Sequence, residues 1–553
     1  MSSVSSAVSR ALLNNNVTEI FGVMGNGNAH FLDAVVRDGL NFTAVRHEGA
    51  SVAAADAYFR ITGKLAVATT TYGAGFTNAI TGLAESVMAQ IPTLLVVGEA
   101  PSTGMRPWDI DQSAINAALG ATTFVLDAER PAAITGEAMA YALRERTAVV
   151  LAIPYDIAAA EAPEEPAVVL ADLQTSTQHP APAPELLTQY ANALSAARRP
   201  VILYGRGARL SGAAEAITLL ADKLGALSAS TVLAPNLLGS RAGDLGIAGG
   251  FSTEETAELI AQADVVLVVG ARLNQFTMRF GDLIASGAQV LQVDIAETAT
   301  HARVDAFLRG DAAGALIALE ALVSERPEAQ KWSSAAADRL VRIKDRDNGS
   351  GQAPDGLLDP RSVASALNTI LPKDRIVVQD GGHFIGWGPM YWDVTGPHAL
   401  TLVGTAYQTI GLGLASAVGA GAAAGDSTVV LATGDGGLLM GLADMESVIR
   451  SVKSGVIVVY NDAAYGAEVH QYGSIGLHEG PMLIPEVDFA AIARGLGARA
   501  TKVLTLDDLA ELSEWVAAGA QGVFVVDCRI SPDVRAPYME EVLEANRKAS
   551  LAR

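Results

Sequence analysis

The sequence predicts an α/β protein with three doubly wound parallel-sheet domains. Short continuous apolar runs alternate with amphipathic stretches of helix length along the whole chain, as is typical of buried parallel strands covered by helices. Two segments interrupt this pattern and resemble exposed linkers: residues 158–185, rich in Ala, Pro and Glu, and residues 346–360, which carry Asp, Asn, Gly, Ser and Pro. The 553 residues therefore divide into domains at 1–165, 186–340 and 357–553.

Ten apolar runs of strand length are expected to form the cores of these sheets. They are Leu65–Thr69, Thr93–Val97, Val149–Ile153, Val201–Tyr204, Val265–Val269, Val290–Val293, Ile376–Val378, Val429–Ala432, Val456–Tyr460 and Val523–Val526. Two further segments, Leu438–Arg450 and the charged Tyr538–Arg553, are expected to be helices.

Composition excludes several classes of protein. Half of the residues are hydrophobic and 18% are charged, which excludes a disordered chain. The formal net charge of −22 leaves no basic footprint for nucleic acid, and no apolar run reaches the roughly 18 residues that cross a bilayer. Without a signal-peptide pattern, a cytoplasmic protein with neither membrane nor nucleic-acid partners is expected. The single cysteine, Cys528, follows an apolar run and is expected in the core.

A glycine-rich turn, Gly434-Asp435-Gly436-Gly437, directly follows one of the expected strands. Glycines at the carboxyl end of a strand let the backbone approach a phosphate group. An aspartate there would repel a bare anion, but it can bind Mg²⁺ that bridges carboxylate and phosphate oxygens. The next strand, Gly455–Tyr460, ends in Asn461-Asp462 and brings further oxygen ligands to the same edge.

The segment from Gly434 to Asp462 resembles the thiamine diphosphate motif of the family of acetohydroxyacid (acetolactate) synthase, pyruvate oxidase and benzoylformate decarboxylase. The resemblance implies that the metal, Mg²⁺, binds the side chains of Asp435 and Asp462 and the carbonyl of Ala464. Asp462 stands where the family usually has Asn, and a register shifted by one residue would place Asn461 on the metal instead. The implied diphosphate-binding positions are Gly434, Asp435, Gly436, Gly437, Asp462, Ala464, Tyr465, Gly466 and Ala467.

The same resemblance implies the remaining cofactor contacts. Glu48, in Val45-Arg-His-Glu-Gly-Ala50, would hydrogen-bond the aminopyrimidine ring and favour the tautomer that deprotonates the thiazolium. In Gly404–Gly413, Ile410 would bend the cofactor and the Gln408 carbonyl would accept from its amino group. Further cofactor contacts are implied for Thr71, Gly73, Asn78, Gly382 and His383.

The residues expected near the substrate differ from those that related enzymes carry at the same positions. Asn26 stands where pyruvate decarboxylases carry an aspartate, and an amide cannot replace a carboxylate as acid or base. Gln112 is a candidate polar group near the reacting carbonyl. Glu468 is a candidate for decarboxylation and proton relay, with a solvated helical pair as the alternative. In the family each active site lies between two subunits, so the resemblance implies a homodimer or homotetramer.

We therefore expect a thiamine diphosphate- and Mg²⁺-dependent 2-oxo acid carboligase or decarboxylase of acetolactate synthase type, acting on small 2-oxo acids or related carbonyl compounds. One alternative is a lyase or hydrolase of a cyclic diketone or acyloin. The other is a non-catalytic relative that binds the cofactor. The central domain of this family sometimes binds FAD or ADP. Here Gly205-Arg-Gly207 is too weak a signal to predict a flavin.

Overall fold

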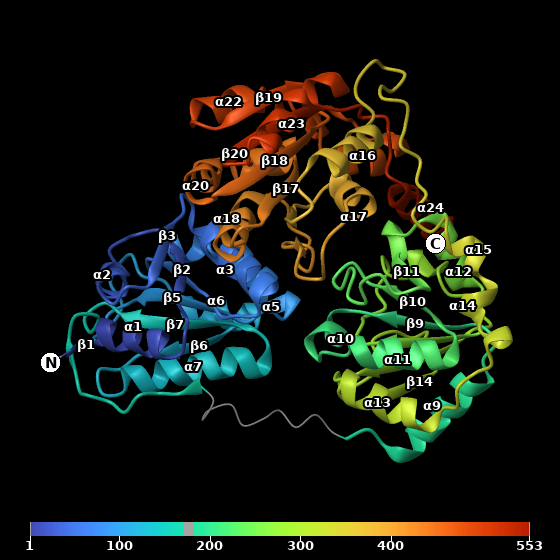
Figure 1. Ribbon diagram of the computed structural model, residues 1–553. Coiled ribbons are helices and arrows are strands. Elements are labelled where there is room, and N and C mark those ends of the chain that lie inside the picture. Colours follow the sequence, from blue (N-terminus) through green and yellow to red (C-terminus); the bar gives the residue numbers. More distant parts are fainter. Residues whose placement is uncertain (1, 171–180, 552–553) are drawn as a thin grey trace.

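Residues 2–170 and 181–551 are described by the computed structural model, and they form three α/β domains, each around its own six-stranded parallel sheet (Figure 1). The strands of the first sheet are β2 (Glu19–Gly22), β3 (Asn41–Ala44), β4 (Val67–Thr70), β5 (Thr93–Glu99), β6 (Thr122–Val125) and β7 (Ala148–Pro154). Those of the central sheet are β9 (Pro200–Tyr204), β10 (Leu227–Ser230), β11 (Asp244–Ile247), β12 (Val265–Val269), β13 (Gln289–Asp294) and β14 (Ala306–Arg309). Those of the third are β15 (Arg375–Gln379), β16 (Leu400–Leu402), β17 (Thr428–Gly434), β18 (Ser454–Asn461), β19 (Arg499–Val503) and β20 (Gly522–Arg529).

Helices cover both faces of each sheet (Figure 1). The first domain has α1 (Val4–Asn14), α2 (Ala29–Arg37), α3 (Glu48–Thr62), α4 (Ala74–Asn78), α5 (Ile80–Ala89), α6 (Gln112–Leu119) and α7 (Pro131–Glu145). The central domain has α9 (Pro184–Ala196), α10 (Arg206–Leu210), α11 (Ala214–Leu224), α12 (Glu254–Ala261), α13 (Ala312–Leu322), α14 (Trp332–Ala335) and α15 (Ala337–Leu340). The third has α16 (Pro360–Ile370), α17 (Trp387–Tyr391), α18 (Gly413–Ala423), α19 (Asp435–Met440), α20 (Met445–Ser451), α21 (Gly466–Gln471), α22 (Phe489–Gly495), α23 (Ala510–Ala517) and α24 (Pro537–Leu551).

The first and third domains share one topology. Their strand orders, β3-β2-β4-β5-β7-β6 and β16-β15-β17-β18-β20-β19, are the same when each set is numbered from its own first strand. In both sheets the strand order reverses beside the strand that comes first in the chain. The switch points lie between β2 and β4 in the first sheet and between β15 and β17 in the third. Ligands of doubly wound sheets bind at the carboxyl edge of such a switch point. The topology therefore marks the loops after these four strands as the candidate site.

The central sheet has the order β11-β10-β9-β12-β13-β14, which is the strand order of the dinucleotide-binding Rossmann fold. The predicted fold class is confirmed, and each of the ten expected strand segments forms or overlaps a strand. Cys528 is buried in β20, as expected. Of the predicted linker 158–185, residues 171–180 lie outside the described part of the chain.

The prediction of one continuous helix over Leu438–Arg450 was wrong. The segment is divided into α19 and α20 by a turn at Gly441, where a side-chain Cβ would lie 2.8 Å from the Gly411 carbonyl oxygen. This close approach needs a glycine, and the glycine ends α19.

Helices α3 and α18 join the first domain to the third (Figure 1). The contact face of α3 consists of small buried side chains, among them Ala53, Ala54 and Ala57. A Cβ at Gly419 of α18 would overlap the carbonyl oxygen of Ala54, so the two backbones touch directly. In the described part of the chain, every helix is too short or too polar to cross a membrane.

Candidate functional site: two strand-end pockets

Two aspartates lie side by side at the carboxyl edge of the third sheet. Strands β17 and β18 are paired up to Gly434 and Tyr460, so Asp435 and Asp462 follow neighbouring strand ends. Asp435 is 2% exposed. Its Oδ1 accepts from the Gly436 N–H at 2.9 Å, whereas its Oδ2 is buried without a hydrogen-bond partner in the described structure. This free oxygen is available to a cation.

Electrostatics at this edge point to the same conclusion. Burial raises the pKa of both Asp435 and Asp462 above the usual aspartate range, and the charge of Asp435 raises the pKa of Asp462 further. A buried and a partly buried carboxylate whose ionisation is disfavoured in this way would be stabilised by a cation bound beside them. The amide nitrogen of the neighbouring Asn461 donates to Asp527 Oδ1 at 3.0 Å and to the Val487 carbonyl at 3.2 Å, whereas its Oδ1, like Asp435 Oδ2, is buried without a partner in the described structure.

Glycines let the backbone pack closely around these aspartates. A Cβ at Gly436 would lie 2.6 Å from the Tyr465 ring, and one at Gly466 would lie 2.6 Å from Asp462 Oδ2. A Cβ at Gly437 would lie 2.7 Å from a carboxylate oxygen of Asp380. The backbone thus packs closely against Asp462 at Gly466, and against Tyr465 and Asp380 at the other two glycines. Oxygen ligands, an unpartnered carboxylate oxygen and a glycine cradle fit a divalent cation that carries a diphosphate.

Asp380 organises the turn that contains Gln408 and Ile410. It follows β15, and its Oδ1 accepts from the N–H groups of Gly381 at 2.8 Å and Gly411 at 3.0 Å. Burial raises its pKa to about 6. Ile410 lies over Gly381, and Gln408 has a left-handed backbone with φ of 62°. Sequence reasoning gave Asp380 no role of its own, although its place after a strand and before two glycines was visible.

His383 lies in a buried cluster beside the same edge. Its Nε2 accepts from the Ala536 N–H at 3.0 Å, so Nδ1 carries the proton of the neutral ring. Burial lowers the pKa of His383 to about 3 and that of His470 to about 4, and the two ring centroids are 4.6 Å apart. Gly382, with φ of 137°, sets the turn before His383. Ala467 and the exposed Glu468 lie in the first turn of α21.

The second pocket lies at the carboxyl edge of the first sheet, around Glu48. This residue begins α3, and its Oε2 accepts from the Asn78 amide at 2.9 Å. Its other oxygen, Oε1, faces Gly75, where a Cβ would lie 3.3 Å away. Thr71 closes the floor of the pocket, because its Oγ1 accepts from the Gly27 N–H at 2.9 Å.

Gln112 does not present a free amide to this pocket. Its Oε1 accepts from the Gly73 N–H at 2.7 Å, and its Nε2 donates to Gly98 O and Glu99 Oε2, each at 3.0 Å. The side chain is buried and holds Gly73 in place, a role different from the expected contact with a reacting carbonyl. Asn26, in contrast, is exposed, and its amide donates to the Tyr72 hydroxyl at 2.9 Å.

The central domain uses its glycines for packing. A Cβ at Gly207 would lie 2.7 Å from Gly270 Cα, and a Cβ at Gly270 would overlap the backbone of Ala208. The loops after β9 and β12 therefore touch each other. Burial and the neighbouring cations Arg60 and Arg272 lower the pKa of Arg206 to about 10.

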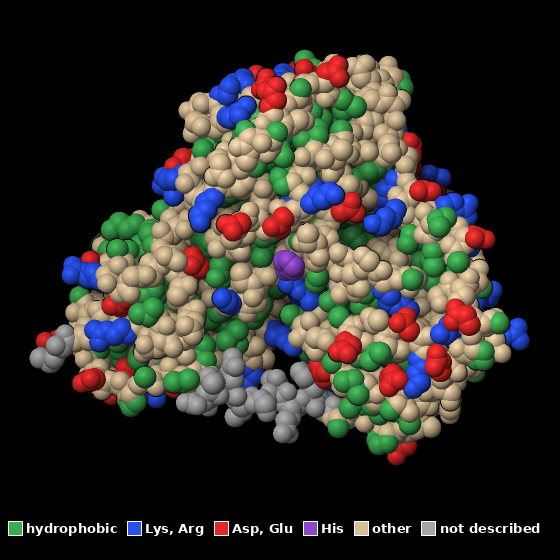
Figure 2. Space-filling view, viewed as in Figure 1, with side chains coloured by type: hydrophobic (Ala, Val, Ile, Leu, Met, Phe, Trp, Pro, Cys, Tyr) green, Lys and Arg blue, Asp and Glu red, His purple; other side chains and the backbone are tan. Residues whose placement is uncertain are grey.

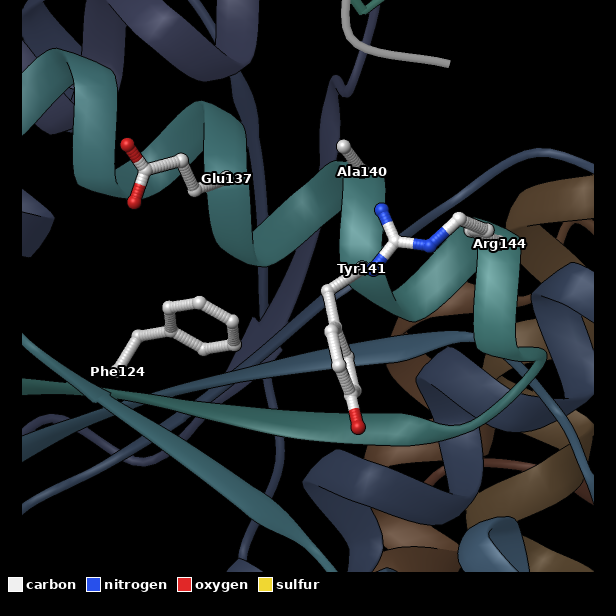
Figure 3. Close-up of a pocket in the computed structure, with 5 residues that line it drawn as sticks. All are labelled: Phe124, Glu137, Ala140, Tyr141 and Arg144. Carbon is white, nitrogen blue, oxygen red and sulfur yellow. The ribbon is translucent and has the colours of Figure 1, made fainter. Parts of the chain in front are cut away.

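A shallow surface pocket elsewhere is separate from both strand-end pockets. It lies between β6 and α7 and is lined by Phe124, Glu137, Ala140, Tyr141 and Arg144 (Figure 3). Strand β6 is at one edge of the first sheet, whereas Glu48 follows β3 at the opposite edge. Acidic and basic side chains are interspersed over the face of the molecule shown in Figure 2.

Comparisons with known proteins agree with this division into three parts. Residues 2–119 match the N-terminal TPP binding domain of thiamine pyrophosphate enzymes, residues 187–321 match the central domain, and residues 380–528 match the C-terminal TPP binding domain. The chain is 28% identical to pyruvate oxidase of Lactiplantibacillus plantarum over 91% of this chain and 84% of that protein. It is 26% identical to the large subunit of acetolactate synthase isozyme 2 of Escherichia coli over 91% of each.

The fold is also that of a solved structure, benzoylformate decarboxylase from Polynucleobacter necessarius. The TM-score is 0.79 and the identity 21%, and the match covers 97% of this chain and 100% of that one. Both pockets belong to the segments that match the two TPP binding domains. The chain is thus an enzyme of the thiamine pyrophosphate (thiamine diphosphate) enzyme family whose members include acetolactate synthases, pyruvate oxidase and 2-oxo acid decarboxylases.

Proposed function

We propose that this protein is a thiamine diphosphate- and Mg²⁺-dependent 2-oxo acid decarboxylase or carboligase of acetolactate synthase type, acting in the cytoplasm. The observation that carries the proposal is the buried, unpartnered Oδ2 of Asp435 next to Asp462 at paired strand ends. Relatives named as acetolactate synthases and as a probable 2-ketoarginine decarboxylase support this range of reactions.

Each group of the third domain has a task in holding the cofactor. Asp435, Asp462 and the Ala464 carbonyl would bind Mg²⁺, and the glycine cradle would admit the diphosphate. His383 Nδ1–H is a donor for a phosphate oxygen. Ile410 would support the bent cofactor, and the Gln408 carbonyl would accept from its amino group. When bound, thiamine diphosphate supplies a nucleophilic carbon and an electron sink for reactions at a carbonyl.

Glu48 would hydrogen-bond the pyrimidine ring of the cofactor and exchange a proton with it. Its Oε2 is held by Asn78, so Oε1 is the oxygen that can hold a proton towards the ring. Asn26 and the Tyr72 hydroxyl present polar groups on the substrate side. Gln112 holds Gly73 in place, and it remains a candidate polar group near the reacting carbonyl.

We further propose that the working enzyme is a homodimer or homotetramer in which Glu48 of one subunit meets Asp435 of another. Within one chain, the Arg46 N–H donates to Asp444 Oδ1 at 2.7 Å. A residue just before the start of α3 thus contacts the residue that precedes α20. The accessible surface of 22130 Å² also exceeds the roughly 19,000 Å² expected for a monomer of 57.1 kDa, which supports association.

The test is CO₂ release from a panel of 2-oxo acids, with thiamine diphosphate and Mg²⁺ present and then omitted, and with products identified by mass. Release that depends on both additions is the expected result. An aldehyde product would indicate decarboxylation alone, and a 2-hydroxyketone would indicate carboligation. If the cofactor binds but no acid loses CO₂, the proposal fails, and cleavage of a cyclic diketone or acyloin becomes the function to examine.

A further inference from the structure

Three aromatic rings surround one guanidinium group on the substrate side of the first domain. The Arg106 guanidinium carbon lies 4.4 Å from the ring centroid of Tyr72, 4.9 Å from that of Tyr155 and 5.5 Å from that of Trp108. The rings of Tyr72 and Tyr155 also meet edge to face at 6.1 Å. We name Tyr72, Trp108 and Tyr155 the aromatic wall. Such an arrangement is a cation-binding cage, and here the chain's own arginine fills it.

The charge of Arg106 is cancelled within the protein. Its Nε donates to Asp109 Oδ2 at 2.9 Å and its terminal nitrogen to Oδ1 at 2.8 Å, a bidentate pair. The Asp109 side chain is 2% exposed and also accepts from the Arg106 backbone N–H. The arginine lowers the pKa of Asp109, which keeps the carboxylate ionised and the pair neutral as a unit.

The aromatic wall borders the Glu48 pocket. Tyr72 follows Thr71, which lies under Gly75 and thus next to Glu48 Oε1. The Tyr72 hydroxyl accepts from Asn26. The Trp108 carbonyl lies 3.9 Å from the position a Cβ would take at Gly73. A substrate that bound beside Glu48 would therefore lie near this wall.

We propose that Arg106 is a positioning residue that fixes the aromatic wall, and that the wall selects 2-oxo acids with uncharged apolar, above all aromatic, side chains. This inference rests on the proposed function and specifies its substrate class. A cationic substrate side chain cannot bind in the cage, because Arg106 already occupies it. A second carboxylate on the substrate would meet no net positive charge, because Asp109 neutralises Arg106. Trp108 is 64% exposed, so the part of its ring that Arg106 does not cover can contact an apolar group.

The first test compares kcat/KM for phenylpyruvate, 4-methyl-2-oxopentanoate, pyruvate and 2-oxoglutarate. The two larger apolar acids should exceed 2-oxoglutarate by at least about 100-fold. Trp108→Ala should lower kcat/KM for phenylpyruvate by about 10-fold or more and that for pyruvate by less than about 3-fold. The matched control is Met88→Ala, another exposed apolar side chain, which should change neither value. Preference for 2-oxoglutarate in the wild type would overturn the inference.

The second test empties the cage. Arg106→Ala should lower kcat/KM for phenylpyruvate, and added guanidinium ion at millimolar concentration should restore it. The same variant should gain activity towards a 2-oxo acid that carries a guanidinium group. Arg37→Ala, which removes an exposed ion pair with Asp33, should show no such rescue. If Arg106→Ala instead raises KM equally for all acids, Arg106 binds the substrate carboxylate and the inference is wrong.

A third readout needs no turnover and separates the two proposals. Trp108 is the exposed tryptophan, since the other four are at most 7% exposed, so acrylamide quenching reports on it. Phenylacetate should protect Trp108 from quenching, and glutarate should not. Protection without CO₂ release from any acid would contradict the proposed function alone. CO₂ release with equal protection by both ligands would contradict the inference alone.

Discussion

The Asn78 amide donates to Glu48 Oε2 at 2.9 Å, and this contact fixes which oxygen of Glu48 is free. The two residues lie at opposite ends of different helices, Glu48 at the start of the long α3 and Asn78 at the end of the short α4. Neither element alone could aim the carboxylate. Their hydrogen bond leaves Oε1 directed at the space over Gly75, where a ring nitrogen could meet it.

Removal of the Glu48 carboxylate should separate binding from turnover. Glu48→Gln keeps the size of the side chain and its contact with Asn78, so thiamine diphosphate should still bind while kcat falls by about 100-fold or more. Asn78→Ala should lower kcat by a smaller factor, because the carboxylate remains but is no longer held. Steady-state kinetics and cofactor titration measure both effects. Unchanged kcat in Glu48→Gln would rule out its catalytic assignment.

The two aspartates of the third domain should differ in their sensitivity to substitution. Asp435→Asn removes the unpartnered buried carboxylate oxygen and should weaken Mg²⁺-dependent cofactor binding by about 100-fold. Asp462→Asn keeps an oxygen ligand and removes a like charge, so its loss should stay within about 10-fold. Titration calorimetry at fixed Mg²⁺ measures both. A larger loss for Asp462→Asn, or none for either, would contradict the assigned metal ligands.

The contact between α3 and α18 should tolerate no added methyl group. Gly419→Ala places a Cβ on the Ala54 carbonyl oxygen, so the helices must separate, at a cost of about 3 kcal/mol or more in unfolding free energy. Gly495→Ala is the control, because nothing lies within 4 Å of a Cβ at that helical position. It should be neutral or stabilising by up to about 1 kcal/mol. Equal unfolding midpoints in urea for the two variants would refute the direct backbone contact.

His470 should make the protein more sensitive to acid. Burial and Arg535 lower its pKa from 6.5 to about 4, so between these values the unfolded state binds more protons than the folded state. The contribution of neutral His470 to the free energy of unfolding is fully present above about pH 6.5. It decreases as the pH falls, by about 2 kcal/mol between pH 7 and pH 5. His470→Gln should abolish this part of the pH dependence. Buried Asp244 and Asp380 act in the opposite direction, so the measured quantity is the difference between variant and wild type at each pH.

Sequence patterns predicted the elements whose signal is local. Val265–Val269 was found as a strand without adjustment, because a buried parallel strand needs a continuous apolar run. Asp435 was identifiable because a strand end and a glycine turn place it at the sheet edge, whereas Glu48 was identified through the resemblance to the family. The partners of Gln112 and the rings around Arg106 were not predictable. They depend on how the segments after β4, β5 and β7 meet in space, and Tyr155 carries no sign in the sequence that it will face Tyr72.

The direct contact between α3 and α18 also has a consequence for biosynthesis. Ala54 and Gly419, where the two helices touch, are about 365 residues apart, so a ribosome that adds about 5–20 residues per second needs roughly 20–70 s to make the second after the first. Throughout that interval the alanine-rich face of α3 has no covering helix. The nascent first domain therefore presents an apolar surface that a chaperone can shield, and a truncated chain that ends before α18 would keep it exposed.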